Sequence, residues 1–114
     1  MKQKQISVDI YNLTVIIYLG TPAELAEQVK LDINPEFQFG NKNGMTCRNK
    51  NKDYEIFMNS EQRVHTRNSL FVHELFHIVD SFTKKIGAYE ERELRAYLAG
   101  YIFSQAEDFL KEED

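Results

Sequence analysis

Two histidines and a glutamate lie close together in the middle of the chain, at His73, Glu74 and His77. On an α-helix, residues four apart lie on one face, so His73 and His77 can direct two imidazole nitrogens at a single metal ion. Glu74 would lie about 100° around the helix from His73, because an α-helix has about 3.6 residues per turn. Its carboxylate is therefore poorly placed as a further ligand, but it can take a proton from a water molecule in an open coordination position.

This spacing matches the H-E-x-x-H pattern of zinc-dependent hydrolases, which requires three residues of given types at fixed offsets. An apolar stripe with helical period runs through the motif at Phe71, Leu75, Ile78, Phe82 and Ile86. We therefore expect a long helix, capped by Asn59 or Ser60 and stopped by Gly87. The alternative interpretation is a metal-free pair of histidines satisfied by hydrogen bonds on a partly buried helix.

A catalytic zinc ion needs a third protein ligand beside the two histidines. The downstream carboxylates that could supply it are Asp80, Glu90, Glu91 and Glu93. Asp80 follows His77 by three residues, so it is better placed to orient an imidazole than to reach the metal. Glu93 would share a helix face with Tyr97, four residues later, so both could point at one site. A phenol there, from Tyr97 or Tyr89, could donate a hydrogen bond to a developing oxyanion.

Length and composition indicate one globular domain spanning residues 1–114, with 42% hydrophobic and 28% charged residues. Fourteen basic against eighteen acidic residues give a formal net charge of −4, which argues against nucleic acid as a partner. The single cysteine, Cys47, excludes an internal disulfide and favours a reducing compartment. No apolar run suits a secretory signal or a membrane span, so we expect a soluble, cytoplasmic protein that does not bind membranes.

Apolar periodicity predicts strands and a helix in the first third of the chain. Ile6, Val8 and Ile10 alternate with polar residues, and residues 14–19 are apolar on both faces, which predicts two antiparallel strands joined near residues 11–13. The run Thr21–Glu24 has the residues of a capping box with proline at the first helical position. Pro35 ends this helix by Asn34.

The remaining segments surround the histidine motif. Residues 44–59 predict a β-hairpin that leads into the long helix, with Cys47 as a small apolar residue in its first strand. A last helix should run from Tyr89 or Glu90 to about Leu110. Gly100 in its middle is expected to allow close packing of a neighbouring helix. His65 lies two turns before His73, about 11 Å away, which is too far to share its metal ion.

Three segments together resemble the gluzincin branch of the zincins, and in particular the small ImmA/IrrE-like metallopeptidases of bacteriophages and mobile elements. They are Tyr54–Asn59, Phe71–His77 and Glu93–Tyr101, within the stretch 44–103. The resemblance implies an α+β fold in which a short, mostly antiparallel sheet packs on a long active-site helix and a C-terminal helix. It implies Zn²⁺ bound by His73, His77 and Glu93, because in such proteins a glutamate precedes an Ala-Tyr-Leu-like helical run.

The expected function is zinc-dependent hydrolysis of peptide bonds, with Glu74 as general base and Tyr97 as a further catalytic group. The resemblance also implies a protein or peptide substrate bound in extended form beside an edge strand, which either strand of the hairpin could supply. The chain lacks room for the second lobe of larger gluzincins, so the alternative is a catalytically weak or inactive zincin-fold module that acts by binding a partner protein. Retention of Glu74 beside both histidines favours the enzyme.

Overall fold

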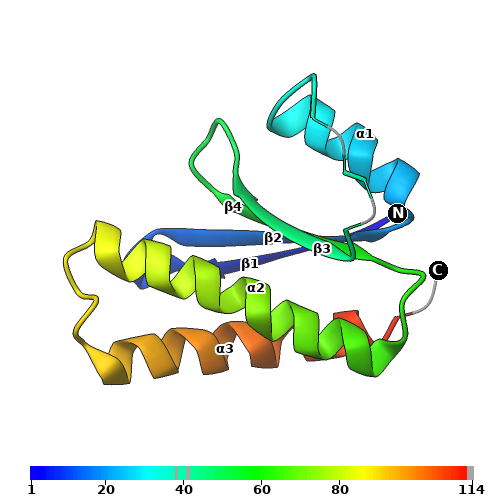
Figure 1. Cartoon of the computed structure of the whole chain (residues 1–114). Coiled ribbons are helices and arrows are strands. Elements are labelled where there is room, and N and C mark those ends of the chain that lie inside the picture. Colours follow the sequence, from blue (N-terminus) through cyan, green and yellow to red (C-terminus); the bar gives the residue numbers. More distant parts are fainter. Residues whose placement is uncertain (38, 41, 113–114) are drawn as a thin grey trace.

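A four-stranded mixed sheet forms the centre of the computed structural model, which describes residues 1–37, 39–40 and 42–112. The strands are β1 (Lys2–Val8), β2 (Leu13–Gly20), β3 (Gly44–Arg48) and β4 (Tyr54–Asn59), in the order β1-β2-β4-β3. β1–β2 and β3–β4 pair antiparallel, whereas β2 and β4 pair parallel. The expected α+β class and the hairpin at residues 44–59 are therefore confirmed, and β3 lies at an edge of the sheet (Figure 1).

The turn of the first hairpin lies where the sequence predicted it, but the first strand ends earlier than expected. Residues Asp9–Tyr11 form a short 3₁₀ turn, and Asn12 takes a left-handed conformation with φ of 52°. Asparagine tolerates this conformation better than most residues. Ile10, expected to continue the first strand, lies in the turn with 82% of its surface exposed. The alternation of apolar and polar residues in the sequence therefore extends beyond Val8, the last residue of β1.

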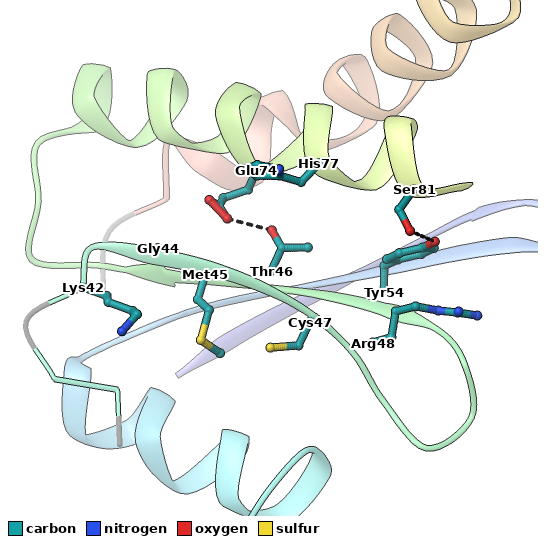
Figure 2. Close-up of a pocket in the computed structure, with 10 residues that line it drawn as sticks. All are labelled: Lys42, Gly44, Met45, Thr46, Cys47, Arg48, Tyr54, Glu74, His77 and Ser81. Atoms are coloured by element: carbon teal, nitrogen blue, oxygen red, sulfur yellow. Dashed lines mark hydrogen bonds between the residues drawn. The ribbon is translucent and has the colours of Figure 1, made fainter. Parts of the chain in front are cut away.

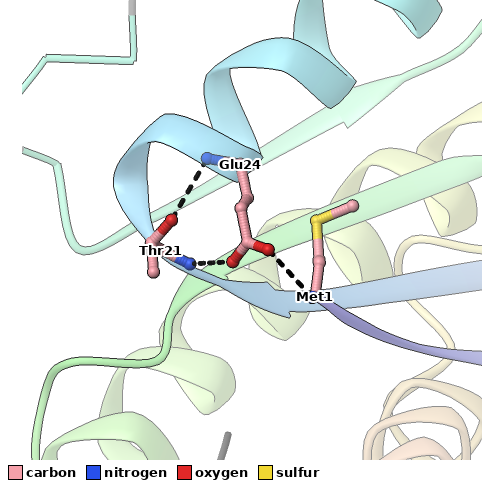
Figure 3. Close-up of polar contacts among 3 residues, drawn as sticks. All are labelled: Met1, Thr21 and Glu24. Carbon is pink, nitrogen blue, oxygen red and sulfur yellow. Dashed lines mark hydrogen bonds and ion pairs between the residues drawn. The ribbon is translucent and has the colours of Figure 1, made fainter.

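Helix α1 (Pro22–Asp32) begins at the predicted capping box. The Thr21 hydroxyl accepts a hydrogen bond from the Glu24 backbone N–H, and the Glu24 carboxylate accepts one from the Thr21 N–H, at 3.2 and 2.9 Å. The other Glu24 oxygen accepts a hydrogen bond of 3.0 Å from the Met1 amino group, so the cap also joins β1 to α1 (Figure 3). These contacts lower the pKa of Glu24, and the hydrogen bond from the Thr21 backbone N–H makes the largest contribution.

The helices cover both faces of the sheet (Figure 1). α1 packs on one face, against β2 and β4, while α2 (Val64–Lys85) and α3 (Arg92–Leu110) pack side by side on the other. Residues of β2 alternate between the two cores: Ile17 contributes to the core under α2 and α3, and Tyr18 to the core under α1. No helix within the described residues is both long and apolar enough to cross a membrane.

Helix α2 begins later than predicted, at Val64 instead of directly after Asn59 or Ser60. The Ser60 N–H donates to the Gly20 carbonyl, and the Asn59 side chain accepts from the Glu61 N–H, at 2.8 and 2.9 Å. These bonds hold residues 59–61 in a turn at the end of the sheet. Of the two predicted caps, Asn59 is therefore the last residue of β4 and Ser60 begins the turn that follows, a position that serine also favours. The helix ends at Lys85, and Gly87 follows with φ of 74°.

Helix α3 starts at Arg92, slightly after the predicted Tyr89 or Glu90, and ends at Leu110 as expected. Arg67 of α2 is buried and donates hydrogen bonds to the carbonyls of Leu110, Glu112 and Ser60, at 2.8, 2.7 and 2.9 Å. It thereby holds the end of α3 against the start of α2. The prediction for Gly100 was wrong, because this residue is exposed and a Cβ atom there would meet nothing within 4 Å.

Candidate metal centre

The imidazoles of His73 and His77 meet on the exposed side of α2, with their Nε2 atoms 3.3 Å apart. Two nitrogens that each lie about 2.0–2.1 Å from a tetrahedral zinc ion are separated by about 3.3–3.4 Å. The pair therefore has the donor type and the spacing that one zinc ion requires. Without a metal the same contact is an imidazole–imidazole hydrogen bond whose donor depends on the tautomer.

Glu74 lies beside the histidines but is turned inward, with only 7% of its surface exposed. Its Oε1 accepts a hydrogen bond of 2.9 Å from the hydroxyl of Thr46 in β3 (Figure 2). Ligand atoms of His73, Glu74 and His77 lie within 4.8 Å of one another. The hydrogen bond from β3 thus orients the Glu74 carboxylate beside the two imidazoles. The sequence predicted this position, because Glu74 directly follows His73 on the helix.

A cleft of about 530 Å³ opens between α2 and β3 at this point. Its walls carry Lys42, Gly44, Met45, Thr46, Cys47, Arg48, Tyr54, Glu74, His77 and Ser81. Figure 2 shows Thr46 directed toward α2, while Met45 and Cys47 lie on the other side of the strand. Tyr54 and Ser81 share a hydrogen bond of 2.9 Å between their hydroxyl oxygens at the far end. The acid–base candidate and one imidazole therefore face a cleft large enough for a peptide segment.

The edge of β3 that faces away from β4 borders the same cleft. Backbone hydrogen bonds from Asn59 N to Asn43 O and from Asn49 N to Asp53 O bracket the pairing of β3 with β4. Because bonded and non-bonded pairs alternate in an antiparallel ladder, the N–H and C=O groups of Gly44, Thr46 and Arg48 point away from β4. β4 is flanked on both sides, so of the two strands of this hairpin only β3 lies at an edge of the sheet, where an extended ligand could pair with it.

The structure does not bring Glu93 and Tyr97 to the histidine pair. Both are exposed and line a separate hollow with Ile10, Tyr11 and Leu94. Arg95 of α3 donates a hydrogen bond of 2.9 Å to Asp80 of α2, so its side of α3 faces α2. Glu93 and Tyr97 are each two residues from Arg95, about 200° around the helix, and point away. The ligand role of Glu93 and the catalytic role of Tyr97 stay predictions from the resemblance.

The other candidate side chains are also placed elsewhere. Asp80 forms its ion pair with Arg95 instead of orienting an imidazole, and Glu90 and Glu91 are exposed where α3 begins. The Tyr89 ring lies against the cations of Lys84 and Arg95, 4.8 and 4.5 Å from its centroid. His65 is exposed in the first turn of α2. Among the described residues, the one group of three metal-ligating side chains is His73, Glu74 and His77.

Sequence reasoning did not single out Thr46, Tyr54 and Ser81, which complete the polar wall of the cleft. Thr46 and Tyr54 belong to paired strands, and their contacts to α2 span 28 and 27 residues. One signal was present for Thr46: it is a polar residue in the middle of a strand of the hairpin, on the face directed at the motif helix. The sequence alone does not show which face of β3 is directed at the helix, because this depends on how β3 pairs with β4 and packs against α2.

A scan against protein-family models gives no match for this chain. Comparison with curated proteins gives none, and comparison with solved structures gives none. The resemblance to zincins therefore depends on the sequence motifs alone, and the arguments about function depend on the geometry of this site.

Proposed function

We propose that this protein is a zinc-dependent peptidase whose centre lies between α2 and β3. The observation that carries the proposal is the Nε2–Nε2 separation of 3.3 Å between His73 and His77, with the buried Glu74 carboxylate beside them. His73 and His77 would hold the ion. Zinc in such a site supplies a Lewis acid, which polarises a carbonyl group and makes water nucleophilic near neutral pH.

Glu74 performs the proton transfers in this proposal. Its carboxylate takes the proton of the attacking water and later gives it to the leaving amide nitrogen. Burial against β3 and the Thr46 hydrogen bond restrict the carboxylate to one side of the cleft, so the base stays aimed at the reacting atoms. Thr46 acts through Glu74 and is a positioning residue.

The substrate in this proposal is a protein or peptide segment in extended form. The N–H and C=O groups of Gly44, Thr46 and Arg48 that point away from β4 have no backbone partner among the described residues and could form a ladder with a bound strand. Such a segment would run along the cleft wall that carries Thr46, directly below Glu74 and His77 (Figure 2). The strand would thereby present successive peptide bonds to the centre.

The experiment compares Glu74→Gln with the wild type on an unstructured protein substrate in the presence of zinc. Hydrolysis should fall by about 10²–10⁴, the usual contribution of acid–base assistance, while the zinc content stays at the wild-type level. Glu107→Gln, an exposed glutamate of α3, is the matched control and should keep wild-type activity. Wild-type hydrolysis by Glu74→Gln would contradict the proposal.

The second candidate is a zincin-like module that acts by binding a partner protein. The observation in its favour is that no third carboxylate or imidazole joins the histidine pair in the described chain beyond Glu74 itself. In that case an extended segment would pair with β3 without being cleaved. A zinc-loaded wild type that binds unstructured protein but cleaves none of it, with binding equal in Glu74→Gln, would favour this candidate.

A further inference from the structure

Two hollows beside β3 lie on either side of the histidine pair. The cleft in Figure 2 reaches His77, and a hollow of about 480 Å³ reaches His73 from the preceding turns of α2. Both are lined by Lys42 and Gly44, so they adjoin. An extended segment paired with β3 would therefore continue past the candidate metal centre in both directions. Side chains beyond the centre can then select which segments bind.

Arg48 is the last residue of β3, two positions after Thr46 and on the same face of the strand. Its partner across the ladder is Tyr54, whose hydroxyl group shares a hydrogen bond with Ser81 of α2. Arg48 therefore lies on the face directed at α2, at the end of the cleft (Figure 2). Because each residue of a strand advances by about 3.4 Å, Arg48 lies about 7 Å along the strand from Thr46.

The guanidinium group of Arg48 is held in place but is not neutralised. Its Nη2 donates a hydrogen bond of 3.2 Å to the Lys52 carbonyl, and its central carbon lies 5.2 Å from the centroid of the Tyr54 ring. Both partners are uncharged groups. Arg48 forms no ion pair with a carboxylate of the described residues. Since a guanidinium group has five N–H donors, donors remain for a ligand.

The carboxylates nearest to Arg48 in the sequence lie on the other face of the sheet. Glu55, Asp53 and Asp32 line a separate cleft beside α1. Burial, opposed by the hydrogen bond from Asn49, and the interactions with Asp32 and Asp53 raise the pKa of Glu55 to about 7. These acids interact with one another and not with Arg48, so its charge is directed at the cleft beside α2.

The cleft beside α2 carries positive charge, although the chain has a formal net charge of −4. Its described lining includes two cations, Arg48 and Lys42, and one carboxylate, Glu74. That carboxylate is buried and accepts a hydrogen bond of 2.9 Å from Thr46. A cleft of positive sign on an acidic protein attracts acidic ligands and disfavours basic ones.

We propose that Arg48 selects segments with an aspartate or glutamate at one fixed position, two residues along the bound strand from the residue opposite Thr46. This inference rests on the part of the proposed function in which an extended segment pairs with β3. Residues opposite each other in neighbouring strands have Cβ atoms about 4.5–5.5 Å apart, so a carboxylate there reaches the guanidinium group. Arginine binds a carboxylate through two parallel hydrogen bonds, a geometry that lysine does not reproduce.

The first test digests a mixture of unstructured peptides with the zinc-loaded full chain and reads the cleavage sites by mass spectrometry. Acidic residues should be enriched at a single position near the cleaved bond, by about tenfold over glutamine and asparagine. Arg48→Gln should abolish this enrichment, and Arg48→Glu should replace it by enrichment of lysine and arginine at the same position. Arg92→Gln, at an exposed arginine of α3, is the matched control and should keep the wild-type preference. A loss of stability alone cannot reverse the preferred charge.

The second test measures binding without cleavage, which separates this inference from the proposed function. The probes are two fluorescent unstructured peptides that carry glutamate or glutamine at alternate positions, followed by anisotropy with the zinc-loaded Glu74→Gln chain. The glutamate peptide should bind about tenfold more tightly, and adding Arg48→Gln should make the two affinities equal. Such binding by a chain whose wild type cleaves nothing would contradict the peptidase and leave the inference standing. Equal binding of both peptides, binding of neither, or an acidic preference unchanged in Arg48→Glu would overturn the inference, whether or not the wild type cleaves.

Discussion

Glu74 and Glu55 are both buried carboxylates that line solvent-accessible clefts, but they lie on opposite faces of the sheet and have opposite neighbours. Glu74 accepts a hydroxyl hydrogen bond from Thr46 and lies beside two imidazoles. Glu55 accepts an amide hydrogen bond from Asn49 and lies beside two further carboxylates. The same type of side chain is thus a candidate base beside a candidate metal site in one place, and a carboxylate with a raised pKa among other acids in the other. The neighbours decide which role is chemically open.

The largest effect that should separate the two carboxylates is the pH dependence of stability. Because the pKa of Glu55 is raised from 4.5 to about 7 in the folded state, its contribution is complete below pH 4.5 and is lost as the pH rises through 7. Glu55→Gln should remove a decline on the order of 2 kcal/mol in the free energy of unfolding between pH 5 and pH 8, as measured by urea unfolding at constant ionic strength. Parallel pH profiles for the wild type and Glu55→Gln would show that Glu55 does not carry this charge cost.

A smaller effect should follow from the hydroxyl that orients Glu74. Thr46→Val keeps the shape of the residue but removes the hydrogen bond to Glu74, so kcat for peptide hydrolysis should fall about tenfold, equivalent to about 1.4 kcal/mol. KM and zinc content should stay near the wild-type values, and Thr46→Ser should restore kcat. A fall in zinc content, or failure of serine to rescue kcat, would indicate a structural role for Thr46 instead.

The smallest effect is expected at Glu93. Since this carboxylate points away from α2 and lines the hollow with Ile10 and Tyr11, Glu93→Gln should change zinc affinity by less than about twofold. Asp108→Asn, another exposed acid of α3, provides the matched control for a change of surface charge. If Glu93→Gln alone loses zinc, the resemblance identified the third ligand and α3 rotates on metal binding.

The elements specified by local patterns could be predicted from the sequence. The capping box at Thr21, the turn at Asn12 and the stop at Gly87 each depend on residues within a few positions, and all three appear where expected. The start of α2 could not be predicted, because Ser60 is held by the carbonyl of Gly20, forty residues earlier. A local pattern at Asn59 and Ser60 fits a cap and a turn equally well.

The residues of the candidate centre also differ in whether local sequence alone determines their positions. His73, Glu74 and His77 belong to one helix, so their spacing alone brings them together. The position of Glu93 depends on the rotation of α3 against α2, which is set by the Asp80–Arg95 ion pair and by packing that includes the contact of Phe71 with Phe103. The local pattern of residues 54–59 does not distinguish Glu55, because its neighbours Asp32 and Asn49 come from other elements. The positions of Glu93 and of the neighbours of Glu55 therefore depend on packing between elements that are distant in the sequence.

The measurement that tests the account most directly is the zinc content of the purified chain and of two single variants, His73→Ala and His77→Ala. After saturation with zinc and removal of the excess, the wild type should retain about one equivalent, because two imidazole nitrogens 3.3 Å apart match the spacing on one ion. Each variant should lose the metal, while His65→Ala, an exposed histidine on the same helix, should keep it. A wild type that retains no zinc, or variants that retain as much as the wild type, would contradict the assignment of a metal centre to His73 and His77.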